Sequence, residues 1–127
     1  MTEAILDASA ILASINQEPG GAEVDLLLED ARVSAVNLAE VVSKLIDKGS
    51  TVDRAIEVAR GLSCRVVPLD EEGAIATGAL RQITAKYGLS LGDRACLALA
   101  RSQGCAALTT DRAWAGVDIG VEIRMLR

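Results

Sequence analysis

The stretch Glu3–Ala10 places one acidic residue between a short apolar run and a helix-like sequence, and this arrangement strongly constrains the fold. Residues 4–6 are apolar, Asp7 follows them, and residues 8–16 have helical composition. The pattern predicts a buried strand over 3–6 that is followed directly by a helix. Ligands of open parallel sheets bind beyond the carboxyl ends of the strands. Asp7 is therefore predicted to lie where such folds carry out chemistry.

Strand-like and helix-like segments alternate along the rest of the chain, which predicts one domain over residues 1–127 with a three-layer α/β sandwich around a parallel sheet. Further strands are predicted over residues 32–36, 65–69, 106–109 and 121–125. Further helices are predicted over 22–30, from Asn37 to the break at Gly49, after a Thr51 cap, over 70–87, and from a Ser90 cap to about Ser102, with a helical turn over 111–114.

Histidine is absent from the sequence, and its absence excludes several kinds of catalytic site. Ser-His and Cys-His nucleophile pairs, histidine general bases and the common histidine-containing zinc sites all require it. The carboxylates that remain suit oxygen-preferring ions such as Mg²⁺ and Mn²⁺. The net charge of −5 argues against a surface-wide basic footprint for nucleic acid, but it permits a local one.

Cysteine usage indicates a reducing compartment, and hydropathy predicts no membrane span. Cys64, Cys96 and Cys105 are odd in number and form no C-x-x-C pair, so we expect free thiols. No apolar run approaches the roughly 18 residues that a membrane span needs. Glu3 and Asp7 stand where a signal peptide would carry basic residues. We therefore expect a cytoplasmic protein with no membrane partner.

Three more acids, Glu40, Asp93 and Asp111, occupy helix starts as Asp7 does, and each has a simple structural explanation. Asp7 and Asp111 stand at N-cap positions, where Asp is among the preferred residues. Asp93 follows Ser90 at the spacing of a capping box, and Asn37-x-x-Glu40 resembles one. Glu40 also lies opposite the apolar stripe of its predicted helix. Taken singly, each acid is explained by helix capping.

Taken together, the four acids favour a different interpretation. All lie at helix starts and three follow strands directly, so all can face one edge of the sheet. Two unit charges about 6 Å apart repel by up to roughly 3 kcal/mol at an effective dielectric constant near 20. Such a cluster persists most naturally when it holds a cation. The set therefore predicts a site for a divalent metal ion.

The motifs around these acids resemble those of PIN-domain ribonucleases, and more narrowly those of VapC-type toxins from bacterial and archaeal toxin–antitoxin pairs. The matching segments are L-D-A-S-A at 6–10, N-L-A-E-V at 37–41, L-G-D-R-A-C-L-A-L-A at 91–100 and T-T-D-R-A-W at 109–114. The resemblance implies a PIN-like sheet of about five strands in the order 3-2-1-4-5. Its switch point lies between the strands that end at Asp7 and Asp111, and Asp70 follows the far edge strand, outside the site.

The resemblance also implies a function and its residues. Asp7, Asp93 and Asp111 would bind one or two Mg²⁺ or Mn²⁺ ions, with Glu40 as a ligand or as the group that orients the attacking water. The chain would be an endoribonuclease whose RNA products carry a 5′-phosphate. A cognate antitoxin that docks on a helical face and obstructs the site, and a homodimer, are implied as well.

Secondary roles are assigned to four further residues, each with a structural alternative. Ser9 and Thr110 match small hydroxyl residues that support such sites, or they are an ordinary helix-start serine and strand-end threonine. Arg94 and Arg112 each follow a site acid and could meet the RNA backbone at the rim, or they are solvated surface arginines or members of structural ion pairs.

Other readings of the whole chain remain open. The same fold without activity would be a PIN-like interaction domain. A haloacid-dehalogenase-like phosphatase would need D-x-D after the first strand, where this chain has Asp7-Ala8-Ser9. A receiver-like domain would need a lysine after a late strand, but Arg112 follows Asp111 and no lysine lies beyond Lys86.

Overall fold

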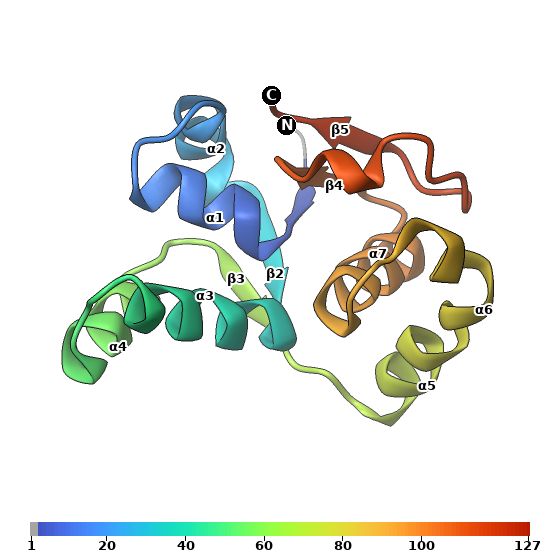
Figure 1. Ribbon diagram of the computed structural model, residues 1–127, viewed down its shortest axis with the longest axis horizontal. Helices are drawn as coiled ribbons and strands as arrows, with labels where there is room; N and C mark the ends of the chain where they lie inside the picture. The colour runs from blue at the N-terminus through green and yellow to red at the C-terminus, as the bar shows by residue number, and fades with distance from the viewer. Residues whose placement is uncertain (1–2) are drawn as a thin grey trace.

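The computed structural model describes residues 3–127, and its centre is a parallel sheet (Figure 1). The strands of this sheet are β1 (Ala4–Leu6), β2 (Ala31–Ser34), β3 (Arg65–Val67), β4 (Ala106–Thr109) and β5 (Ile123–Met125). Their order is β3-β2-β1-β4-β5, and each neighbouring pair is parallel. The predicted α/β fold and strand order are confirmed, and β1 lies at the centre of the sheet.

Helices cover both faces of this sheet. Figure 1 shows α1 to α4 on one side and α5 to α7 on the other. The α-helices are α1 (Ala8–Ile15), α2 (Gly21–Leu27), α3 (Ala35–Asp47), α4 (Val52–Arg60), α5 (Glu71–Ala79), α6 (Arg81–Thr84) and α7 (Leu91–Gln103). Short 3₁₀ turns are η1 (Leu28–Asp30), η2 (Ala85–Tyr87) and η3 (Arg112–Trp114).

The alternation of side chains along β1 creates two apolar layers. Ala4 and Leu6 pack with residues of α1 to α4, whereas Ile5 packs with residues of α7 on the opposite face. All three side chains are fully buried. Successive residues of a strand point to opposite faces, so a single three-residue strand joins both cores. Trp114 packs into the second core with 1% exposure.

The start of α3 differs from the prediction. The expected strand over 32–36 ends at Ser34, and the helix begins at Ala35 rather than at Asn37. Ser34 is the N-cap, because its hydroxyl accepts a hydrogen bond from the backbone N–H of Val36 at 3.2 Å. Asn37 therefore lies inside the first turn of α3 and is not a cap.

The single helix predicted over 70–87 is broken into α5, α6 and η2. Gly73 and Gly78 lower the helix propensity of this segment. Thr84 donates its hydroxyl proton to the Leu80 carbonyl at 2.7 Å, a bond of the kind that bends helices. Similarly, the helix predicted over 22–30 ends as α2 at Leu27 and continues as η1.

The carboxyl ends of β1 and β4 meet at one edge of the sheet and define its switch point. Leu6 pairs with Leu108, and the Asp7 N–H donates to the Leu108 carbonyl at 3.2 Å. Asp70 follows β3, which lies at the outer edge of the sheet. Within residues 3–127, no helix is both long and apolar enough to cross a membrane.

Candidate active site

Asp7 is the most buried of the four acids and is held by three hydrogen bonds. Its Oδ1 accepts from the Ala10 N–H at 2.8 Å and from the Ser9 hydroxyl at 2.7 Å, and its Oδ2 accepts from the Thr109 hydroxyl at 2.5 Å. The residue is 3% exposed. Burial raises the pKa of this carboxyl to about 6, and the three donors only partly offset that effect.

Two hydroxyl groups join the end of β1 to the end of β4. The Ser9 hydroxyl oxygen accepts from the Thr110 N–H at 3.0 Å, and the Thr109 hydroxyl oxygen accepts from the Asp111 N–H at 2.9 Å. Ser9 and Thr109 are thus bonded both to Asp7 and to the backbone that leads to Asp111. The network fixes the relative positions of two of the four acids.

Thr109, which was not predicted as a site residue, bonds directly to Asp7, whereas the predicted Thr110 joins the network through its backbone N–H. The Thr109 side chain is fully buried against Asp7, whereas the Thr110 hydroxyl accepts from Arg127 at 3.3 Å. Neighbouring residues at the end of a strand point in opposite directions. The sequence shows only two adjacent threonines, and the directions of their side chains at the end of β4 distinguish their roles.

Glu40 extends from α3 toward the first turn of α7 and is half-buried. Its Oε1 accepts from the Asn37 side-chain nitrogen at 2.8 Å, and that nitrogen also donates to the Gly92 carbonyl at 3.0 Å. A Cβ atom at position 92 would lie 2.3 Å from Oε1 of Glu40. The carboxylate therefore rests directly on the backbone of α7, and sequence reasoning did not identify the two residues that place it there.

Asp93 and Asp111 are helix caps, as their sequence positions suggested. Asp93 and Ser90 form a complete capping box at the start of α7, with the Ser90 N–H 2.9 Å from Oδ2 of Asp93. Asp111 precedes η3, and its Oδ1 accepts from the Ala113 N–H at 2.9 Å. Capping occupies only one carboxylate oxygen of each residue, so it does not exclude a second role for either.

Electrostatics place three of the acids around one point of α7. The pKa of the Cys96 thiol is raised well above its usual range, first by complete burial and then by the negative charges of Asp7, Asp93 and Glu40. The charge of Asp93 also adds to the rise in the Asp7 pKa. The negative charges of Asp7, Glu40 and Asp93 therefore all act on the Cys96 thiol, and Asp111 follows β4, the strand next to β1.

The carboxylate oxygens of the four acids suit a divalent cation, although these side chains do not converge on a common point. In residues 3–127, no three acidic, cysteine or histidine side chains stand close enough to bind a metal ion together. None of the ion pairs among these residues includes one of the four acids. No hydrogen bond from the described residues reaches one oxygen of Glu40, of Asp93 or of Asp111. Rotation of these side chains would bring oxygen donors, of the kind that Mg²⁺ prefers, closer together.

Arg94 lies away from the rim where RNA contact was expected. It is 8% exposed, and its guanidinium donates to the Thr77 carbonyl of α5 at 3.1 Å. Adjacent helical residues point about 100° apart, so Asp93 does not share the direction of Arg94 toward α5. Arg112 is exposed next to Asp111, which fits both a rim residue and a solvated surface arginine.

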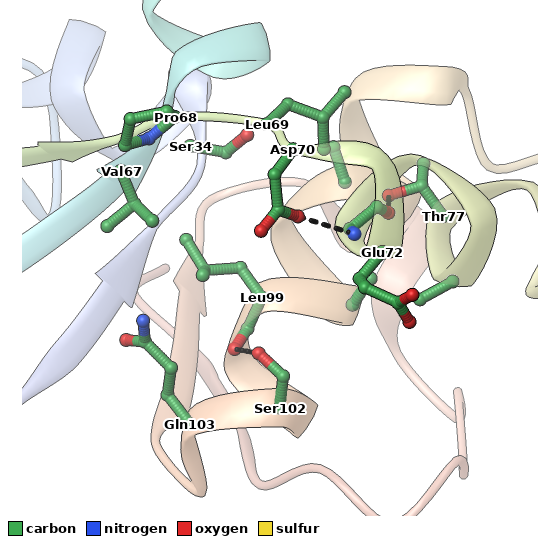
Figure 2. Close-up of a pocket in the computed structure, with 14 residues that line it drawn as sticks. Ser34, Val67, Pro68, Leu69, Asp70, Glu72, Thr77, Leu99, Ser102 and Gln103 are labelled. Carbon is green, nitrogen blue, oxygen red and sulfur yellow. Dashed lines mark hydrogen bonds between the residues drawn. The ribbon is translucent and has the colours of Figure 1, made fainter.

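Asp70 belongs to a separate cavity of about 420 Å³. Figure 2 shows this cavity between the loop after β3, α5 and α7, with Asp70 bonded to the start of α5. Oδ1 of Asp70 accepts from the Gly73 N–H at 2.8 Å. The four site acids do not line the cavity, so Asp70 is a cap outside the candidate site.

Solved structures similar to this chain share its fold. A chain of the DNA-bound VapBC complex from Salmonella typhimurium matches at 24% identity, with 100% of both chains covered and a TM-score of 0.76. FitAcB from Neisseria gonorrhoeae matches at 22% identity, covering 94% of this chain and 95% of that one, with a TM-score of 0.70. A VapC toxin from Mycobacterium tuberculosis, described as cleaving the sarcin–ricin loop, matches at 16% identity, 94% and 98% coverage and a TM-score of 0.70.

The comparison with sequence families is more direct. No curated protein matches the chain. The model of the PIN domain family matches residues 4–120, a range that contains Asp7, Glu40, Asp93 and Asp111. That match covers most of the sequence and all of the candidate site. The chain therefore belongs to the PIN domain family.

Proposed function

We propose that this protein is an endoribonuclease that depends on Mg²⁺ or Mn²⁺. The observation that carries the proposal is a PIN-domain chain in which none of Asp7, Glu40, Asp93 and Asp111 is in an ion pair within residues 3–127. Carboxylates that share a site and lack basic partners favour a bound cation. The family membership excludes the haloacid-dehalogenase-like alternative.

Each acid has a separate task in this proposal. When bound, the divalent ion supplies an activated water and stabilises charge on the scissile phosphate. Asp7 is already immobilised by Ala10, Ser9 and Thr109, and its Oδ2 accepts only one of these bonds. Asp93 and Asp111 each keep one oxygen for the ion while the other caps a helix. Glu40 is a further ligand or orients the attacking water.

Cleavage of total RNA by the purified protein tests the proposal. We expect cleavage with Mg²⁺ or Mn²⁺, none in excess EDTA, and none by Asp7→Asn with either ion. Hydrolysis by water rather than by the ribose 2′-hydroxyl leaves 5′-phosphate ends. Undiminished cleavage in EDTA, or products with 2′,3′-cyclic phosphates, would contradict the proposal.

The biological role that we propose is that of the toxin in a toxin–antitoxin pair, acting in the cytoplasm. The similar structures from Salmonella typhimurium, Klebsiella pneumoniae and Rickettsia felis are of toxin–antitoxin complexes. An antitoxin would dock on a helical face and obstruct the site, and the toxin would form a homodimer. Expression of the chain alone should arrest growth, and Asp7→Asn should abolish the arrest. Normal growth at high expression of active, folded protein would count against this role.

A catalytically silent PIN domain is the second candidate, because the structure shows Asp93 and Asp111 as helix caps. Such a domain would keep its fold and would bind a partner without cleaving RNA. Its four carboxylates would give no metal-dependent stabilisation. The RNA cleavage experiment separates the two candidates directly.

A further inference from the structure

The side-chain amide of Asn37 lies between the helices that carry Glu40 and Asp93. Asn37 is in the first turn of α3 and is 1% exposed. Its nitrogen donates to Oε1 of Glu40 at 2.8 Å and to the Gly92 carbonyl at 3.0 Å. Gly92 directly precedes Asp93 in α7. One buried nitrogen therefore joins the Glu40 carboxylate to the backbone that carries another site acid.

The orientation of this amide is determined by its partners. Both partners are acceptors, so the nitrogen must face them, and the Oδ1 atom of Asn37 is left buried without a partner among the described residues. A buried acceptor without a partner lowers stability. Within α7 the Gly92 carbonyl can accept from the N–H four residues later, so it does not depend on Asn37. An apolar side chain of similar size would leave no buried acceptor unpaired. Fold stability alone therefore does not account for an asparagine here.

Gly92 is a second feature that fixes the same carboxylate. A Cβ atom there would lie 2.3 Å from Oε1 and 2.4 Å from Oε2 of Glu40, distances that real Cβ atoms do not reach. The carboxylate therefore occupies space that only a glycine leaves open. Asn37 binds it from α3, and the backbone at Gly92, which carries no Cβ atom, lies against it from α7.

We propose that Asn37 is a positioning residue for Glu40. It holds Oε1 of Glu40 against the first turn of α7, beside Asp93, and leaves Oε2 for the cation or its water. This inference rests on the proposed function, because the position matters only if Glu40 takes part in a metal site. Residues that orient ligands in this way change metal affinity by about 10- to 100-fold when they are removed.

Mn²⁺ binding to the full chain tests the inference without RNA. The variants are Asn37→Leu, which keeps the volume of the side chain, Glu40→Ala, and the two combined. Thr84→Val is the matched control, because it removes another buried side-chain bond to a helical carbonyl, at Leu80. We expect Asn37→Leu to raise the Mn²⁺ Kd about tenfold, and Thr84→Val to leave it within twofold of wild type.

The double variant decides whether Asn37 acts through Glu40. In the Glu40→Ala background, Asn37→Leu should change the Mn²⁺ Kd less than about twofold, because a residue that works through another has no effect once that partner is gone. The inference would be overturned if Asn37→Leu bound Mn²⁺ with the wild-type Kd. It would also be overturned if Asn37→Leu raised the Kd as much in the Glu40→Ala background as in the wild type.

A measurement in EDTA separates this inference from the proposed function. In ¹³C-labelled protein, the side-chain carboxyl resonance of Glu40 should move in Asn37→Leu and stay in place in Thr84→Val. If the wild type binds no Mn²⁺ and cleaves no RNA, the proposed function fails, and this resonance still reports whether Asn37 positions Glu40. An unchanged resonance in Asn37→Leu overturns the positioning role in either case.

Discussion

Neutralising Asp7 should stabilise the metal-free protein at neutral pH. Burial raises the pKa of Asp7 from 3.8 to about 6 in the folded protein. Each pKa unit corresponds to 1.36 kcal/mol, so ionising this carboxyl lowers the free energy of unfolding by about 3 kcal/mol. Because the folded-state pKa is the higher one, the stabilising contribution is complete below pH 3.8 and is lost as the pH rises through about 6. The uncharged Asn side chain resembles the protonated carboxyl, so the unfolding free energy of Asp7→Asn does not fall in this way as the pH rises.

Urea denaturation in EDTA at several pH values between about 4 and 8 measures the effect. The difference in unfolding free energy between Asp7→Asn and wild type should grow by about 3 kcal/mol over this range and level off above the folded-state pKa. Comparing the two proteins at each pH cancels the titration of the other acids. Asp70→Asn is the control for an Asp-to-Asn exchange at an N-cap, where the two residues are about equally effective. A difference for Asp7→Asn that does not change with pH would refute the reasoning.

Three further substitutions test the contacts of the site. Gly92→Ala should leave the unfolding free energy in EDTA within about 1 kcal/mol of wild type, because alanine favours the helix while Glu40 must swing away. Calorimetry should nevertheless show weaker Mg²⁺ binding. Unchanged Mg²⁺ binding would contradict the close approach of the Glu40 carboxylate to Gly92. Thr109→Val should destabilise the protein by about 1–3 kcal/mol, because Oδ2 of Asp7 loses its donor. Thr110→Val should lower the unfolding free energy by less than about 0.5 kcal/mol in a urea titration, since among the described residues its hydroxyl bonds only to Arg127. Equal losses in the two threonine variants would contradict the opposite directions assigned to their side chains at the end of β4.

The parts of the fold that depend on local patterns could be predicted from the sequence. The apolar run before Asp7 predicted the buried strand, and the caps at Thr51 and Ser90 marked the starts of α4 and α7. The strand order came from the family resemblance, because spacing alone does not determine which strands are neighbours. The break in the helix over 70–87 was missed, since the propensity of two glycines and the hydroxyl bond of Thr84 together decide it.

The parts of the site that depend on long-range contacts could not be predicted. Ser9 and Thr110 meet only because β1 and β4 are neighbours. Asn37 was interpreted as a cap because the sequence does not show that α3 and α7 touch at Gly92. The burial of Arg94 depends in the same way on the packing of α5 against α7, which no local pattern reveals.

Metal-linked thermal stability is the measurement that tests the central claim most directly. Melts of wild type, Asp7→Asn, Glu40→Gln, Asp93→Asn and Asp70→Asn are compared in Mg²⁺ and in EDTA. If the acids form a metal site, wild type and Asp70→Asn gain about 2.7 kcal/mol at a hundred times the dissociation constant, and the three site variants gain little. If the acids are only helix caps, Asn and Gln replace them with little effect. Equal Mg²⁺ gains in wild type, Asp7→Asn and Asp93→Asn would contradict the account.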